Sequence, residues 1–210
     1  MSNSVSIQPV GNHVSRWGEG PRFWNNSLLY VDIEGHALIR LCLDPIHEDV
    51  WDVGERIGTV APTRDGSLLC AGDSGIFSFC LQGAEKKLLV DPESHKRPDN
   101  RFNDGLCDPS GRFWAGTMST TKQTGDASLY MLDHEGCLHK KIDHVTNSNG
   151  ICWNATASLM YYIDTPTKKV LAYPFDNTTG NLGAPTELID IETAGIEGSP
   201  DGMTIDVDGN

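Results

Sequence analysis

The sequence lacks the features that mark several large classes of protein. In its 210 residues, no apolar run approaches the ~18 residues that a membrane-spanning helix requires. No stretch of fifteen residues free of glycine and proline shows a helical period of 3.6. Lys and Arg number 16 against 29 Asp and Glu, giving a formal net charge of −13, whereas binding to a phosphate backbone needs a surplus of cations. We therefore expect a protein without long helices that binds neither membranes nor nucleic acids.

Several common catalytic motifs are also missing. Ser15, Ser74 and Ser148 have no G-x-S-x-G context, which argues against a nucleophile elbow. The seven histidines show neither H-x-x-x-H nor H-E-x-x-H spacing, and we expect them at the surface. A phosphate-binding G-x-x-x-x-G-K-[ST] loop is absent as well. The chemistry of this protein must therefore be sought in other residue types.

The six cysteines form no C-x-x-C pair, and several lie in apolar runs that read as strands. A free cysteine in such a run packs as a small apolar residue, so we expect reduced, buried thiols. The N-terminus has neither the basic nor the apolar region of a signal peptide, and we expect a cytoplasmic protein. The cysteines are Cys42, Cys70, Cys80, Cys107, Cys137 and Cys152.

What the sequence does contain is a repeat. Short apolar runs that follow turn residues begin 40, 45 and 46 residues apart, at Leu28, Leu68, Phe113 and Leu159. A second pattern, a polar residue followed by glycine and then by an apolar residue or proline, precedes most of these runs. It occurs as "GEGP" at 18–21, "NDGL" at 103–106, "SNGI" at 148–151 and "PDGM" at 200–203, while the second unit has "RIGTV" instead.

A unit of ~45 residues that holds four short antiparallel strands is typical of a β-propeller blade. Further strand candidates, "ALIRLCL", "GIFSFCL", "ASLYMLD" and "KVLAYPF", follow in the same order in each unit. An irregular β-sandwich with accidental spacing is the alternative. We expect an all-β protein in which residues 1–210 form one propeller domain, and in which each unit runs from the polar–glycine pair into its first strand.

The fifth unit contains only "SPDGMTIDVDGN", in which Met203, Ile205 and Val207 alternate like a strand before a turn. A propeller must close to hide its sheet edges. We therefore expect this chain to be an incomplete propeller, truncated after about four blades, with its C-terminal blades missing.

The first strand of each blade begins near the central axis, so residues at equivalent places in the repeat are expected to meet there. These residues are all oxygen donors, which suit a hard cation such as Ca²⁺, Mg²⁺ or Mn²⁺ better than a thiolate-type zinc site. Ordinary Asp-Gly and Asn-Gly turns are the alternative. The residues are Glu19, Asn103, Asp104, Asn149 and Asp201.

The stretches "WGEGP", "NRFNDG", "GRFWAGTM", "SNGICW" and "SPDGMTIDVDGN" closely resemble the senescence marker protein 30, gluconolactonase and luciferin-regenerating enzyme family. The resemblance runs in the same order over the whole chain, and "R-x-N-D-G" and "S-P-D-G-M" are its most specific parts. It implies a six-bladed propeller with one catalytic divalent cation near the axis (Ca²⁺, Mn²⁺, Mg²⁺ or Zn²⁺). It also implies hydrolysis of a small-molecule sugar lactone.

Carried over by motif, the resemblance implies that Glu19, Asn149 and Asp201 ligate the cation. It further implies that Arg101 and Asn103 contact the substrate, and we group the neighbouring Asp104 with them. The family often has acidic residues after "GTM", where this chain has the sequence Ser-Thr-Thr-Lys at 119–122, which bears on substrate preference.

We expect the cation to polarise the lactone carbonyl while water attacks it. Asp201 is the expected catalytic base, and a hydroxide on the cation is the rival account. Two other functions stay open: a non-enzymatic calcium-binding or regulatory propeller, and a hydrolase of a non-sugar ester. The oligomeric state does not follow from the sequence.

Overall fold

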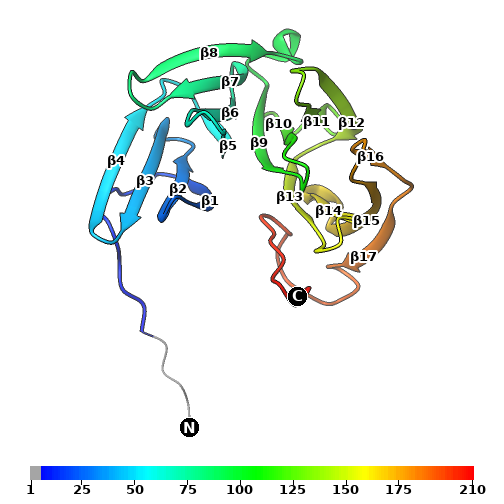
Figure 1. Cartoon of the computed structure of the whole chain (residues 1–210). Helices are drawn as coiled ribbons and strands as arrows, with labels where there is room; N and C mark the ends of the chain where they lie inside the picture. Colours follow the sequence, from blue (N-terminus) through cyan, green and yellow to red (C-terminus); the bar gives the residue numbers. More distant parts are fainter. Residues whose placement is uncertain (1–5) are drawn as a thin grey trace.

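The computed structural model describes residues 6–210 and consists almost entirely of β-strands. The strands form four antiparallel sheets, and within each sheet the strands are ordered as in the sequence or in its reverse. The sheets follow one another along an arc, each with its first strand toward the inside (Figure 1). In the part that the structure describes, no helix is long and apolar enough to cross a membrane.

The first sheet contains four strands in the order of the sequence. They are β1 (Gly18–Trp24), β2 (Ser27–Asp32), β3 (Ala37–Leu43) and β4 (Ile46–Asp52). An Asn-Asn pair with positive φ at both residues joins the first two strands, as the tightest hairpin turns require.

The second sheet shows how burial falls from the inside of the arc to the outside. Its strands are β5 (Ile57–Pro62), β6 (Leu68–Gly72), β7 (Gly75–Cys80) and β8 (Glu85–Val90). Five of the six residues of β5 are buried, whereas β8 is exposed along nearly its whole length. The inner strand β5 is buried because neighbouring sheets cover both of its faces, with contacts to β9 on one side and to β1 and β2 on the other.

The third and fourth sheets repeat this arrangement. The third contains β9 (Asn100–Cys107), β10 (Phe113–Ser119), β11 (Ala127–Leu132) and β12 (Leu138–Val145), and it follows the short 3-10 helix η1 (Ser94–Lys96).

The fourth sheet begins with β13 (Ser148–Trp153) and β14 (Leu159–Asp164). After the 3-10 helix η2 (Thr165–Thr167) come β15 (Lys169–Asp176), β16 (Asn181–Leu182) and β17 (Thr186–Asp190). Both β16 and β17 pair with β15, so two short segments take the outer position.

The hydrophobic core lies between the sheets rather than inside any one of them. One cluster joins the first sheet to the second, another the second to the third, and another the third to the fourth. In the last of these, the rings of Trp114 and Trp153 meet edge to face with centroids 5.6 Å apart. Aromatic pairs of this geometry stabilise the contact beyond the area that they bury.

The predicted apolar repeat is confirmed, since Leu28, Leu68, Phe113 and Leu159 all lie at or next to the start of the second strand of a sheet. The predicted position of the polar–glycine pattern is wrong. We placed it ahead of the first strand, but in β1, β9 and β13 it lies within that strand. The strand continues through the glycine, and its pairing with the second strand slips at the glycine or within two residues of it, as at a β-bulge.

The strand that we predicted over residues 203–207 is also not observed: residues 191–210 contain no strand, and Val207 is 94% exposed. A strand needs a partner for its backbone groups, and this segment makes one backbone hydrogen bond to β13, from Gly150 N to Asp201 O at 3.1 Å. The four observed sheets match four blades, while the six-bladed total and the truncation stay predictions.

All six cysteines are free, as expected. Their burial was predicted only in part. Cys70 and Cys152 are buried, but Cys137 is exposed because it follows the turn that leads into β12, an outer strand.

Gly58 on β5 allows the second and third sheets to approach closely. A Cβ atom at this position would lie 2.3 Å from the carbonyl oxygen of Asn103 and 2.6 Å from its Cα. We expect Gly58→Ala to lower the free energy of unfolding by about 1–3 kcal/mol, since overpacking forces the backbone to shift. Thermal denaturation followed by circular dichroism measures this change.

Gly83→Ala is the matched control, because its Cβ would meet only the flexible side chain of Glu85, at 3.3 Å. We expect it to change the free energy of unfolding by less than about 0.5 kcal/mol. Equal melting temperatures for the two variants would contradict the close approach at Gly58.

Candidate functional site

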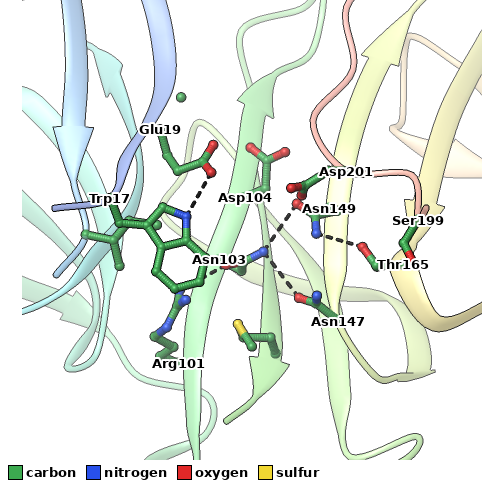
Figure 2. A pocket seen from close by; sticks show the side chains of 14 residues that line it. Trp17, Glu19, Arg101, Asn103, Asp104, Asn147, Asn149, Thr165, Ser199 and Asp201 are labelled. Atoms are coloured by element: carbon green, nitrogen blue, oxygen red, sulfur yellow. Dashed lines mark hydrogen bonds between the residues drawn. The ribbon is translucent and has the colours of Figure 1, made fainter. Parts of the chain in front are cut away.

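The inner strands converge on a cavity of about 160 Å³. All six residues predicted for the site line it, although they come from three strands and from the C-terminal segment (Figure 2). Figure 2 also shows the carboxylates of Glu19, Asp104 and Asp201 turned toward a common space. The six residues are Glu19, Arg101, Asn103, Asp104, Asn149 and Asp201.

The bulges explain why these side chains face the cavity. In the third sheet, Asp104 pairs with Gly116 and Phe102 with Thr117, so Asn103 has no partner of its own. In the fourth sheet the pairing passes from Ser148 directly to Ile151, which leaves Asn149 and Gly150 opposite a single residue. A bulge interrupts the alternation of side chains between the two faces of a sheet and re-aims the extra residue.

Arg101 lines the cavity and is only 5% exposed. Its Nη1 donates to the carbonyl oxygen of Phe102 at 2.9 Å and to Oδ1 of Asn103 at 3.0 Å. Burial lowers the pKa of Arg101 from its ordinary value, and the nearby guanidinium of Arg56 acts in the same direction. A guanidinium nevertheless stays protonated in proteins, so Arg101 acts only as a donor.

The side chain of Asn103 joins the third sheet to the fourth. Because its Oδ1 accepts from Arg101, its Nδ2 faces β13 and donates there. It donates to the carbonyl oxygen of Ser148 at 2.9 Å and makes longer contacts of 3.3 Å to Oδ1 of Asn147 and Oδ1 of Asn149. These contacts fix which side of the Asn103 amide carries the oxygen.

Asn149 is buried and is held from its other side by η2. Its Nδ2 donates to Oγ1 of Thr165 at 2.7 Å, which leaves Oδ1 facing Asn103 and the cavity. The hydroxyl of Thr165 in turn donates to the carbonyl oxygen of Pro200 at 3.0 Å. A hydrogen-bonded path therefore runs from β9 through β13 and η2 to the C-terminal segment.

The acidic residues of the site lie close enough to influence one another. Desolvation by the surrounding protein raises the pKa of Asp104, and the negative charges of Glu19 and Asp201 raise it further. The hydrogen bond from Gly105 N, 2.7 Å from Oδ1 of Asp104, opposes this shift, as does the charge of Arg22. Glu19 accepts a hydrogen bond of 3.0 Å from the indole of Trp17.

This donor set fits a hard divalent cation. Glu19, Asn149 and Asp201 offer carboxylate and amide oxygens, and none of the residues that line the cavity is a cysteine or a histidine. Burial is the main cause of the raised pKa of Asp104, and a cation would relieve the smaller contribution that comes from the charges of Glu19 and Asp201. Among residues 6–210, no group of three or more His, Cys, Asp or Glu side chains is arranged to hold a metal ion. The predicted ligand set differs from such a group, because it consists of two carboxylates and the amide of Asn149.

Sequence reasoning missed several residues that line the cavity, among them Trp17, Asn147 and Thr165. Trp17 and Asn147 each stand two positions before a predicted ligand, and Trp17 lies in the motif "WGEGP", which offered a signal, whereas Asn147 lies just before the motif "SNGICW". Thr165 follows β14, outside every repeated motif, and only the folded chain brings it to Asn149.

Comparisons with known proteins identify the family of this chain. The family model described as "SMP-30/Gluconolactonase/LRE-like region" matches residues 17–210. The chain belongs to this family. Among its relatives, a putative sugar lactone lactonase of Bacillus subtilis, YvrE, is 34% identical over 205 residues, covering 91% of this chain and 65% of the relative. Regucalcin of Danio rerio is 33% identical over 212 residues, which cover 99% of this chain and 70% of that protein.

A solved structure of the same family, a calcium-binding regucalcin from Agrobacterium tumefaciens, superposes with a TM-score of 0.86 at 30% identity. The match covers 93% of this chain and 66% of that one. The chain thus spans about two thirds of the length of the family members that it matches.

The shifted pKa of Asp104 predicts a pH-dependent stability. Because the pKa is raised in the folded state, folding disfavours the charged carboxylate, and stability is lost as the pH rises from the unfolded value of ~4 through the folded one. We expect Asp104→Asn to melt at a higher temperature than the wild type at pH 7 without added metal. The difference should shrink as the pH falls toward ~4.

Thermal melts across this pH range measure the effect, with Asp208→Asn, an equal charge change on the exposed C-terminal segment, as the control. A wild type that is more stable than Asp104→Asn at pH 7, or a difference independent of pH, would contradict the assignment.

Proposed function

We propose that this protein is a metal-dependent hydrolase that opens sugar lactones. The observation that carries the proposal is that three carboxylates, a buried amide and a buried arginine line one cavity. Membership of a family that includes gluconolactonases, and a relative named as a putative sugar lactone lactonase, support the same chemistry.

The residues that would hold the cation are Glu19, Asn149 and Asp201. When bound, a divalent cation supplies Lewis-acid polarisation of the lactone carbonyl and stabilises the developing oxyanion. Oxygen ligands favour Ca²⁺, Mg²⁺ or Mn²⁺, and Zn²⁺ also accepts carboxylates.

Arg101, Asn103 and Trp17 are proposed to orient the substrate. A guanidinium carries five N–H donors, and those of Arg101 that do not bind Phe102 and Asn103 are available for hydroxyl or carbonyl oxygens of a sugar lactone. Trp17 is 52% exposed and lines the cavity, so its indole offers a flat apolar surface to a sugar ring.

Asp201 is proposed to accept the proton of the attacking water. The water oxygen forms a bond to the carbonyl carbon, the ring C–O bond breaks, and the ring oxygen leaves as a hydroxyl that takes up the proton. The product is an open-chain hydroxy acid. The place of Asp104, beside Glu19 and Asp201, suits a hydrogen bond to a substrate hydroxyl.

A second function has one specific observation in its favour, since a solved relative is described as a calcium-binding protein. Binding of a cation without turnover would need the oxygen ligands but not the arrangement of Arg101 and Asn103. If the protein is a hydrolase, a non-sugar ester is the alternative substrate, because the side chain of Met118 adds an apolar surface to the cavity.

The central test compares Asp201→Ala with the wild type in hydrolysis of δ-gluconolactone, with the spontaneous background subtracted. We expect wild-type activity that depends on added Ca²⁺, Mn²⁺ or Zn²⁺ and falls at least about 100-fold in the variant, because one side chain supplies both a ligand and the base. Asp208→Ala, on the same exposed segment, should retain full activity. If the wild type binds the cation but hydrolyses none of a panel of lactones, the lactonase proposal is wrong and the cation-binding function takes its place.

Arg101→Lys tests the positioning of the substrate. Lysine keeps the charge but loses the planar fork, so it cannot hold Asn103 and a substrate oxygen together. We expect kcat/KM to fall about 10- to 100-fold, with unchanged affinity for the cation in calorimetric titrations. Arg64→Lys, at an exposed turn, is the control. Equal kinetics of the two variants would remove Arg101 from the substrate site.

A further inference from the structure

We propose that Thr165 is a positioning residue that couples two of the predicted cation ligands, Asn149 and Asp201, through its single hydroxyl. This inference deepens the proposed function and rests on it for the identity of the ligands. The hydroxyl accepts a hydrogen bond from Nδ2 of Asn149 at 2.7 Å and donates one to the carbonyl oxygen of Pro200 at 3.0 Å, next to Asp201.

The direction of these hydrogen bonds is set by the groups at the two ends of the path. Arg101 has only donors, so Oδ1 of Asn103 must accept and Nδ2 of Asn103 must donate. At the other end, the carbonyl of Pro200 can only accept, so Thr165 must donate to it. Thr165 therefore has to accept from Asn149, and it does so from Nδ2.

This direction decides which atom Asn149 presents to the cavity. The two sides of a carboxamide have nearly the same shape, and only the oxygen binds a cation. A flipped Asn149 would present its amine group to the cavity and would place an oxygen, which cannot donate, against the hydroxyl of Thr165. The contact with Thr165 thus holds Asn149 in the orientation that a ligand needs.

The same hydroxyl holds the segment that carries Asp201. This segment belongs to no strand, so no ladder of backbone hydrogen bonds places it. Two hydrogen bonds connect residues 200–201 to the fourth sheet: the one from Thr165 to Pro200, and the one of 3.1 Å from Gly150 N to the carbonyl oxygen of Asp201. Loss of the first would leave a single hydrogen bond between residues 200–201 and the fourth sheet.

Thr165 is itself well anchored. Its backbone N–H donates to the carbonyl oxygen of Asn147 at 3.1 Å, and its own carbonyl accepts from Lys168 N at 3.1 Å. The hydroxyl therefore projects from a fixed turn at the end of β14. Side chains that orient the ligands of a metal commonly change its affinity 10- to 100-fold when they are removed.

The test uses three variants of the full-length protein, with Mn²⁺ as the probe in calorimetric titrations. Thr165→Val keeps the shape but removes the hydroxyl, and we expect its dissociation constant to rise about 10- to 100-fold. Thr165→Ser keeps the hydroxyl and should stay within about threefold of the wild type. Thr167→Val is the matched control, because it removes a hydroxyl of the same turn that donates to the carbonyl oxygen of Asp164 and does not line the cavity.

A second readout needs no metal. In the metal-free protein, the side-chain amide of Asn149, assigned by its loss in Asn149→Asp, should exchange slowly with solvent in NMR spectra. We expect at least tenfold faster exchange in Thr165→Val and no change in Thr165→Ser or Thr167→Val. Should Thr165→Val fail to fold, Thr165→Ala removes the same hydroxyl without a branched side chain.

Mn²⁺ affinity and amide exchange of Thr165→Val that match those of Thr167→Val would overturn the inference and leave the proposed function standing. A wild type that takes up no Mn²⁺ would overturn the proposed metal site, and the amide exchange would then decide the positioning role of Thr165 alone.

Discussion

The bulge in the first strand of each sheet is the constraint on which the site depends. In a regular strand, successive side chains point to opposite faces, and the residues after Arg101 or Ser148 would then alternate into the cores between the sheets. Because the pairing slips at Asn103 and at Asn149, these polar side chains leave the apolar faces and turn to the cavity. Glycine is needed at these points for close approach. A Cβ on Gly150 would lie 2.7 Å from the carbonyl oxygen of Asp201, so the fold and the site share the same glycine positions.

The cavity is also the place where separate sheets are joined by polar contacts rather than by apolar packing. The clusters between the sheets determine how far apart the sheets lie, but apolar contacts have little directional preference. The path of hydrogen bonds from Arg101 to Pro200 has a direction, and it passes through Asn103, Asn149 and Thr165 in turn. Such a network is rigid only when each of its members is satisfied. The burial of Arg101 is therefore understandable: a donor that cannot lose its proton defines the orientation of every amide that follows.

The repeat in the sequence was enough to predict much of this arrangement. The spacing of Leu28, Leu68 and the later apolar runs identified the second strands, and residues at equivalent places in the repeat were correctly expected to meet in one cavity. The features that the repeat did not predict have physical causes. The polar–glycine pairs look like turns because glycine and asparagine favour turns, and only the pairing register shows that they are bulges within strands. Alternation from Met203 to Val207 has the period of a strand, but a strand also requires a partner. Thr165 lies in no repeated motif, and its role arises from contacts between residues distant in the sequence.

The electrostatics of the cavity connect the stability of the protein to its proposed chemistry. Glu19, Asp104 and Asp201 place three carboxylates around the cavity, and the pKa of Asp104 is raised mainly by its burial and further by the other two charges. The positive charges of Arg22, which donates to the carbonyl oxygen of Gly105, and of Arg101 offset part of this negative charge. In the proposed function, a bound divalent cation neutralises the rest of the negative charge. Its ligands come from β1, β13 and the C-terminal segment, so binding would tie the first sheet to the last across the arc. A ligand that binds only the folded state stabilises that state by mass action. Affinity for the cation and stability of the arc are therefore expected to change together whenever one of these ligands, or the residue that orients it, is altered.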